Sequence, residues 1–139
     1  MVDWAQVLHA HGCQLQPGAT DDEVTRAETA LETVLCDDLR GLYLATDGVY
    51  DSQGEWFVIW PLSQVVSRNR NDWAIEVYQT RQELLGFGDD GTGAPFCVRR
   101  DGRSGIYIWI PVGGEEVTWL ADDVNSFWRG WLAGKLPPY

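Results

Sequence analysis

Residues 84–98 have the sequence LLGFGDDGTGAPFCV, in which two apolar runs flank four glycines and two adjacent aspartates. Glycine tolerates positive φ and close backbone packing, so this composition predicts a tight loop of defined shape between two buried strands. The chain before residue 84 has a mostly helical pattern, and the chain after residue 98 has the pattern of further strands. The stretch therefore predicts a sheet whose strands follow a helical N-terminal half.

Apolar spacing, caps and chain breakers predict four helical segments ahead of this stretch. They are residues 2–11, residues 21–35 behind a capping box of Thr20 and Glu23, a short helix capped by Asp37 and ended by Asp47-Gly48, and a segment capped by Ser63 with Val65, Val66, Trp73, Ile75 and Val77 available for burial. The polar run over residues 68–72 leaves open whether the last segment is one continuous helix.

Strands are predicted on both sides of the glycine-rich loop from β-branched and aromatic content. They cover residues 55–60, 84–88, 95–99, 105–110 and 116–119. Residues 99–105 contain an Asp-Gly turn signal and are predicted to be a hairpin tip. A last helix starts at Ala121 or Asp122, and its apolar residues share one face.

The order of these segments, helices first and then strands with a closing helix, is typical of an α+β fold. We predict one domain over residues 1–139. It has N-terminal helices, an antiparallel or mixed sheet of about five to six strands, and a C-terminal amphipathic helix packed on the sheet. The length suffices for one hydrophobic core, which eight tryptophans make strongly aromatic.

The acidic charge of the chain is concentrated in its first 60 residues. Residues 1–60 contain eleven acidic residues and two arginines, a net charge of −9, whereas residues 61–139 contain ten acidic and eight basic residues, a net charge of −2. Such a surface disfavours nucleic-acid binding, which needs Lys and Arg against phosphate. It fits either a solvated surface that keeps the protein soluble or a basic protein partner attracted over a distance.

Cysteine usage and the N-terminal sequence indicate the cytoplasm. Cys13, Cys36 and Cys97 are odd in number and widely spaced, which favours free thiols in a reducing compartment over disulfides. The N-terminus carries Asp3 where a signal peptide needs positive charge. Since no apolar run approaches the roughly 18–20 residues of a membrane span, we expect a cytoplasmic protein with no membrane association.

No arrangement of residues points convincingly to catalysis or to a metal or cofactor site. Asp89-Asp90 is a candidate acid–base or metal pair, but no third ligand follows at the spacing of a calcium loop, and turn capping or partner contact are the alternatives. His9, His11 and Cys13 alternate in sequence but lack the fourth ligand of a typical zinc site. The glycines lack the Gly-Lys-Ser/Thr of a phosphate-binding loop.

Arginines and tryptophans supply further candidates for partner contacts. Arg99, Arg100 and Arg103 on the hairpin tip either contact an acidic partner or belong to a solvated turn. The tryptophans that lie on apolar faces are predicted core residues, namely Trp109, Trp128 and Trp131. The remaining candidates could be either core or exposed contact residues, namely Trp56, Trp73 and Trp119.

Six different segments follow one another in a characteristic order along the chain. They are residues 17–23, residues 39–48 ending in Thr46-Asp47-Gly48, WPLS at 60–63 with Asn69 downstream, residues 86–93, IYIW at 106–109, and LAD at 120–122 with Phe127 and Leu132. Together they resemble the SUKH superfamily, which contains the cell-wall-synthesis regulator family of fungi and many bacterial immunity proteins. The resemblance covers roughly residues 16–133, and residues 87–93, FGDDGTG, are its most specific part, although Thr92 stands where many relatives have a glycine.

The resemblance implies a non-catalytic binding protein. Many bacterial members of this superfamily bind and block a cognate toxin, often a nuclease. Nine arginines against one lysine favour a high-GC bacterial genome. We therefore expect an immunity protein, a monomer or weak dimer, that neutralises a basic nuclease-type toxin by presenting acidic groups in place of phosphate. A regulatory scaffold of the same fold and a hydrolase using Asp89 and Asp90 are the alternatives.

Two sets of residues carry these expectations. The predicted partner-contact residues are acidic or aromatic and comprise Asp47, Asp51, Glu55, Trp56, Asp89 and Asp90. The predicted fold signature comprises Gly86, Gly88, Asp89, Asp90, Gly91 and Gly93. In this interpretation the glycine-rich loop joins two core strands, and its carboxylates satisfy loop amides or lie beside an acidic binding surface.

Overall fold

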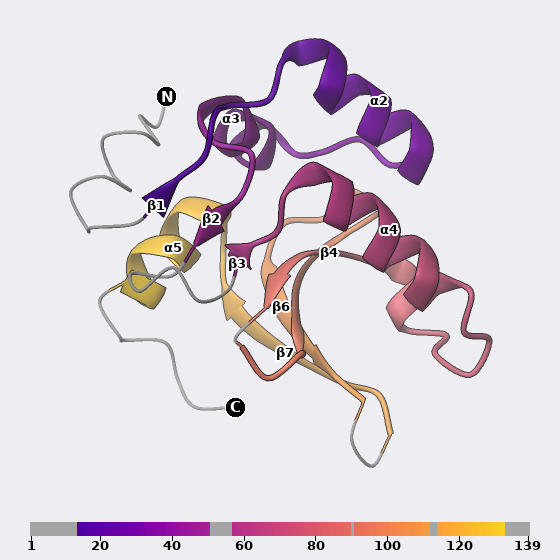
Figure 1. Ribbon diagram of the computed structural model, residues 1–139. Coiled ribbons are helices and arrows are strands. Elements are labelled where there is room, and N and C mark those ends of the chain that lie inside the picture. Colours follow the sequence, from indigo (N-terminus) through magenta and orange to yellow (C-terminus); the bar gives the residue numbers. More distant parts are fainter. Residues whose placement is uncertain (1–13, 51–56, 90, 112–113, 133–139) are drawn as a thin grey trace.

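The computed structural model describes residues 14–50, 57–89, 91–111 and 114–132 (Figure 1). Its elements alternate between a helical layer and one sheet. In chain order they are β1 (Gln14–Leu15), α2 (Asp21–Leu31), α3 (Asp37–Ala45), β2 (Val49–Tyr50), β3 (Phe57–Ile59), α4 (Leu62–Trp73), the 3-10 turn η1 (Arg81–Glu83), β4 (Leu84–Asp89), β5 (Pro95–Arg99), β6 (Ile106–Ile110), β7 (Glu116–Ala121) and α5 (Val124–Leu132).

The sheet contains the strands β1 to β7 in sequence order, and every neighbouring pair is antiparallel. The predicted α+β class and the antiparallel sheet are therefore confirmed. The two strands that precede β3 contain only two residues each. Such short pairs have little β-propensity signal, which explains why the sequence pattern emphasised the longer strands.

The helices cover one face of the sheet and form the main core with it. Helices α2, α3 and α4 lie together on one side of the strands, and α5 lies near β2 and beneath α3 (Figure 1). Alternate residues of β4 and β5, such as Phe87 and Phe96, point into this core, where both contact Phe127 edge-on. A smaller cluster of Leu84, Cys97 and Trp109 occupies the opposite face of the sheet.

Helix α2 begins as predicted but ends four residues early. The Thr20 and Glu23 capping box is present, with hydrogen bonds of 3.0 and 3.1 Å. Glu32 adopts a left-handed conformation with φ of 52° and ends the helix, so the prediction of a helix over residues 21–35 is wrong at its C-terminus. As a result Val34 lies beyond the helix and is 83% exposed, whereas Leu35 still reaches the core.

Helix α4 runs without a break through the polar residues 68–72. The sequence left this continuity open, and the structure resolves it because Asn69 faces inward and is completely buried. The predicted cap is wrong, since the N-cap is Pro61 and Ser63 lies inside the helix. The expectation that Ile75 and Val77 are buried is also wrong, because both lie beyond the helix and are exposed.

Gly86 and Gly88 lie inside β4 and not in the loop that follows it. The strand predicted over residues 84–88 is therefore present and extends to Asp89, so the first two glycines of the glycine-rich stretch are strand residues. A bulge shifts the β4–β5 register between the two glycines. A Cβ at Gly88 would overlap the Val58 carbonyl oxygen, so this position requires glycine for the close approach of β3 and not for a turn.

Candidate functional site

Four of the six predicted partner-contact residues fall outside the described residues, namely Asp51, Glu55, Trp56 and Asp90. The two that are described, Asp47 and Asp89, both hold internal hydrogen bonds. Asp47 Oδ1 accepts from the Leu62 backbone N–H at 2.7 Å. It thereby satisfies the first N–H of α4 from a position 15 residues earlier in the sequence. The Asp47 backbone N–H donates to the Pro17 carbonyl at 3.0 Å. Their role in partner binding stays a prediction.

Asp89 is 7% exposed and joins the end of β4 to the loop that follows. Its Oδ2 accepts from the indole Nε1 of Trp60 at 3.0 Å, and its Oδ1 accepts from the Gly91 backbone N–H at 2.7 Å. Arg68 stacks over the Trp60 ring at 4.8 Å and places Nη1 3.9 Å from Asp89. The bond from the Gly91 N–H to Asp89 Oδ1 is the capping of a loop amide that the composition predicted.

Behind β4 lies a buried polar network centred on Asn69 and Arg81. Asn69 Oδ1 accepts from the Gly86 N–H at 2.8 Å and from Arg81 Nη2 at 2.7 Å, while its Nδ2 donates to the carbonyls of Val65 and Gly86. Arg81 is completely buried, donates to Leu84 O and pairs with Asp72 at 3.1 Å. Every one of these groups has a partner, so the network is structural.

Arg81 is not among the residues predicted from the sequence, whereas Asn69 belongs to the segments that resemble the family. No periodic signal marks Arg81, because it stands in a short 3-10 turn before β4. The outside of the same turn is fixed by Glu115, whose carboxylate accepts from the N–H groups of Thr80 and Arg81. Desolvation raises the pKa of Glu115, but these donors and the Trp109 indole lower it by more, so it lies below its usual value.

The arginines of the hairpin tip have separate roles. Arg103 pairs with Asp101 at 2.7 Å on the surface, as a solvated turn predicts, and this bond lowers the pKa of Asp101. Arg100 instead stacks on Trp73 at 3.7 Å and donates to Thr33 Oγ1 and the Leu31 carbonyl. The solvated turn, one of the two alternatives left open by the sequence, therefore does not describe Arg100, and desolvation lowers the pKa of its guanidinium.

The tryptophans divide largely as predicted. Trp109 and Trp128 are buried, whereas the side chain of Trp131 lies outside the described residues. Trp73 is half-buried and donates to the carbonyls of Arg81 and Leu84. Trp119 is 53% exposed on the edge strand β7.

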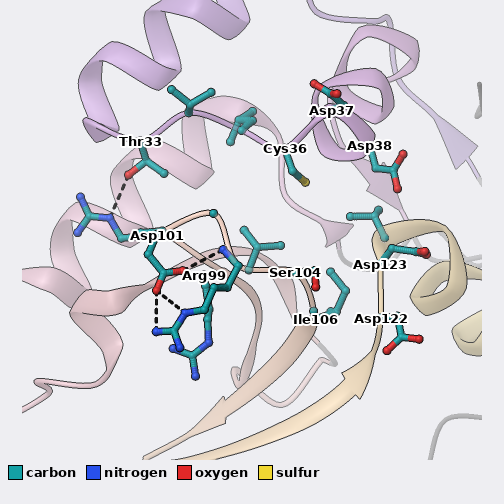
Figure 2. A pocket seen from close by; sticks show the side chains of 18 of the residues that line it. Thr33, Cys36, Asp37, Asp38, Arg99, Asp101, Ser104, Ile106, Asp122 and Asp123 are labelled. Atoms are coloured by element: carbon teal, nitrogen blue, oxygen red, sulfur yellow. Dashed lines mark hydrogen bonds and ion pairs between the residues drawn. The ribbon is translucent and has the colours of Figure 1, made fainter.

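A groove of about 800 Å³ opens between three connections that are distant in sequence. They are the α2–α3 loop with the start of α3, the β5–β6 hairpin, and the β7–α5 turn (Figure 2). We call it the hairpin groove. Its lining includes the exposed Val34, the largely buried Leu35, and the buried Val98, Ile106 and Val124 beneath them.

Charge is segregated along the hairpin groove. Asp37 and Asp38 start α3, and Asp122 and Asp123 precede α5, so four carboxylates from opposite ends of the sequence gather at one end (Figure 2). Arg99 and Asp101 lie at the other end. Such an arrangement of an apolar wall beside grouped charges is suited to binding another molecule.

Cys36 lies in the hairpin groove and Cys97 lies in the small core cluster, and both are free thiols. Desolvation raises the pKa of Cys36 and raises that of Cys97 to about 12, which keeps both protonated at neutral pH. Cys13 lies outside the described residues. Within the described ranges, no three His, Cys, Asp or Glu side chains are grouped to hold a metal ion, and no helix has the length and apolar character to cross a membrane.

Comparison with known proteins locates the fold in a family. No curated protein matches the chain. The sequence profile of the SMI1 / KNR4 family (SUKH-1) matches residues 18–130, which span the elements from α2 into α5 and include both the buried network and the hairpin groove. The match covers well over half of the chain, and the chain therefore belongs to the SMI1 / KNR4 family (SUKH-1).

Proposed function

We propose that this protein is a non-catalytic immunity protein that binds and neutralises a basic toxin domain, of the nuclease type. The observation that carries the proposal is the hairpin groove, whose grouped carboxylates and exposed valine lie in a SUKH-1 domain. Membership of this family supports protein–protein interaction as the mode of action. The net charge of −11 supports a basic partner, because long-range attraction raises the rate of encounter between opposite charges.

The contacts of Asp89 support a binding protein over a hydrolase. A catalytic carboxylate must reach a substrate, whereas both oxygens of Asp89 accept hydrogen bonds from the protein itself. Substrate turnover by the purified protein that disappears in Asp89→Asn, in a variant that remains folded, would favour the hydrolase instead.

The test uses the product of the neighbouring reading frame. We expect its toxin domain to bind the purified protein in isothermal titration calorimetry, and co-expression to rescue cells from the toxin. Because the proposed attraction is electrostatic, the affinity should fall when NaCl is raised from 50 mM to 500 mM, since added salt screens exposed charges.

Three outcomes separate the alternatives. Salt-sensitive binding with rescue supports the immunity proposal. Binding that is insensitive to salt overturns the role of acidic charge. Absence of any neighbouring toxin, together with specific binding of several proteins of the host, favours a regulatory scaffold acting in the cytoplasm.

A further inference from the structure

We infer that the hairpin groove is the docking site for an extended basic segment of the partner, with an aliphatic side chain against Val34 and a Lys or Arg side chain against the aspartates that start α3 and precede α5. This inference rests on the proposed function, because it assumes a protein partner. It adds the site and the chemistry of the segment that the site takes.

Val34 is exposed on a loop that hydrogen bonds hold in place. The neighbouring residues are held by hydrogen bonds, since the Leu35 N–H donates to Glu28 Oε2 at 2.8 Å and Thr33 accepts from Arg100 Nε at 3.0 Å. Thr33 and Leu35 point inward, so the loop presents Val34 to solvent at the groove. An aliphatic side chain on a fixed loop loses little conformational entropy on binding.

The negative charge at the acidic end of the hairpin groove is not balanced by nearby bases. Within the described part of the chain, no ion pair joins Asp37, Asp38, Asp122 or Asp123 to a base. Asp123 Oδ1 accepts from the Ser126 N–H at 2.7 Å as the cap of α5. The positive ends of α3 and α5 contribute roughly half a charge each. About one positive unit therefore offsets four carboxylates, and the end stays strongly negative.

The arginines that line the hairpin groove already have partners within the protein. Arg103 is paired with Asp101, Arg100 is turned toward Thr33 and the Leu31 carbonyl, and Arg99 stacks over Tyr107 at 5.1 Å. They neither neutralise the aspartates at the far end nor form a site for an acidic occupant. The acidic end of the groove is therefore the part that would attract a charged partner, and that partner must be positively charged.

Charge complementarity identifies the class of occupant. A nucleic acid would bring phosphates to four carboxylates, and a second copy of this chain would bring a further net charge of −11. A basic protein segment supplies positive charge to the aspartates and can place an aliphatic side chain against Val34. A volume of about 800 Å³ admits a few side chains of such a segment.

The first experiment uses a defined peptide and Cys36 as the reporter. The capped peptide Gly-Arg-Leu-Arg-Gly is added to the full chain, and alkylation of Cys36 by N-ethylmaleimide is followed by mass spectrometry of the peptide fragment that contains it. We expect saturating peptide to slow alkylation at least threefold. The peptide Gly-Glu-Leu-Glu-Gly should leave the rate unchanged, and Gly-Arg-Gly-Arg-Gly should bind at least fivefold more weakly.

Two double variants with the same charge change locate the peptide. Asp37→Lys/Asp122→Lys should abolish protection by Gly-Arg-Leu-Arg-Gly, whereas Glu76→Lys/Glu116→Lys, which changes exposed carboxylates outside the groove, should retain it. Val34→Ser should remove the preference for leucine over glycine in the peptide. The inference would be overturned if both double variants lost the protection of Cys36 equally, or if the glutamate peptide protected Cys36 as well as the arginine peptide does. Circular dichroism confirms that each variant is folded.

The second experiment separates this inference from the proposed function. The neighbouring toxin domain is titrated against wild type and against both double variants. Loss of at least tenfold in affinity in Asp37→Lys/Asp122→Lys alone supports docking in the groove. Unchanged affinity in that variant overturns the groove as docking site and leaves the immunity proposal standing. If the wild type does not bind the toxin domain, the immunity proposal is overturned. The peptide experiment on Cys36 does not depend on that result and still tests whether the groove takes a basic segment.

Discussion

The buried network behind β4 and the hairpin groove are both rich in polar groups, yet they differ in how these groups are satisfied. In the network, Asn69 and Arg81 are completely buried and bonded to backbone and side-chain partners on every side. In the groove, Asp37 and Asp122 are exposed and lie outside every ion pair of the described residues. A satisfied polar cluster stabilises a fold, whereas an unsatisfied exposed one is available to a partner.

This difference changes the interpretation of the glycine-rich stretch. The stretch looks chemically active because it combines glycines with adjacent carboxylates, but its described polar groups belong to the satisfied region. The residues that line the groove form no local motif, since they come from three connections separated in sequence. Substitutions should therefore reduce stability in the first region and binding in the second.

The largest expected effect is that of Asn69→Ala. It removes one of the three hydrogen-bond partners of the buried Arg81 guanidinium and the side chain that bonds both backbone groups of Gly86, so we expect a loss of about 4 kcal/mol in the free energy of unfolding. Urea denaturation followed by tryptophan fluorescence measures it. Asn71→Ala changes an exposed residue of the same helix and should cost under about 0.5 kcal/mol. Equal losses in the two variants would contradict the network's role.

Gly88→Ala should follow, with a loss of about 3 kcal/mol, because its Cβ overlaps the Val58 carbonyl and β3 must move away from β4. Gly93→Ala is the comparison. A Cβ added at Gly93 would meet no neighbouring atom, but the backbone there has a φ of +95°. We therefore expect about 1 kcal/mol of backbone strain from alanine at this position. Thermal unfolding of both variants ranks them. If Gly93→Ala were the more damaging, turn conformation and not strand approach would explain the motif.

Asp89→Ala should cost about 2 kcal/mol, since the Trp60 indole and the Gly91 N–H lose their acceptor. Affinity for the partner should stay unchanged when measured at a temperature where the variant is folded. Loss of affinity at preserved stability would instead restore Asp89 as a contact residue, as first predicted from the sequence.

Glu115→Gln should have a smaller, pH-dependent effect. The folded-state pKa lies below the ordinary value of 4.5, so the unfolded chain binds more protons in this range and stability rises with pH. The variant should be less stable than wild type at pH 7, and the difference should shrink as the pH falls below 4.5 through the folded-state pKa. Urea titrations at several pH values measure the difference. A gap that is constant with pH would assign the effect to packing.

The smallest effect on stability is expected from Val34→Ser in the groove, at under about 0.5 kcal/mol, because the side chain is 83% exposed. The same variant should weaken partner binding measurably. A loss of stability comparable to that of Asp89→Ala would show that Val34 supports the fold and would weaken the contrast between the two regions.

Local signals in the sequence predicted the regular elements well and their ends less well. The capping box at Thr20 and the apolar spacing behind it are contained within one helix, so α2 begins where predicted. Its end depends on Glu32 entering a left-handed conformation, which no glycine signals. The start of α4 was misplaced for a similar reason, since its cap comes from Asp47, which is 15 residues away.

The candidate site was less accessible to sequence reasoning. The charge count pointed to the first 60 residues, and Asp37 and Asp38 indeed lie there. Their neighbours in the groove, Asp122 and Asp123, come from the other end of the chain, where the charge is nearly balanced. A count along the sequence cannot show that the starts of two helices meet at one surface.

The sequence by itself determined the α+β class, the order of the helices and the longer strands, the capping box and membership of the SUKH-1 family, because periodicity, capping and motif spacing are local properties of the chain. Only the tertiary structure decided where polar groups are satisfied. Arg100 reaches Thr33 across 67 residues and Asn69 reaches Gly86 across 17. The Asn69–Gly86 bonds hold the first part of the glycine-rich stretch, residues 86–89, in the core, whereas residues 91–93 and the acidic groove stay exposed, since burial depends on which segments the fold brings together.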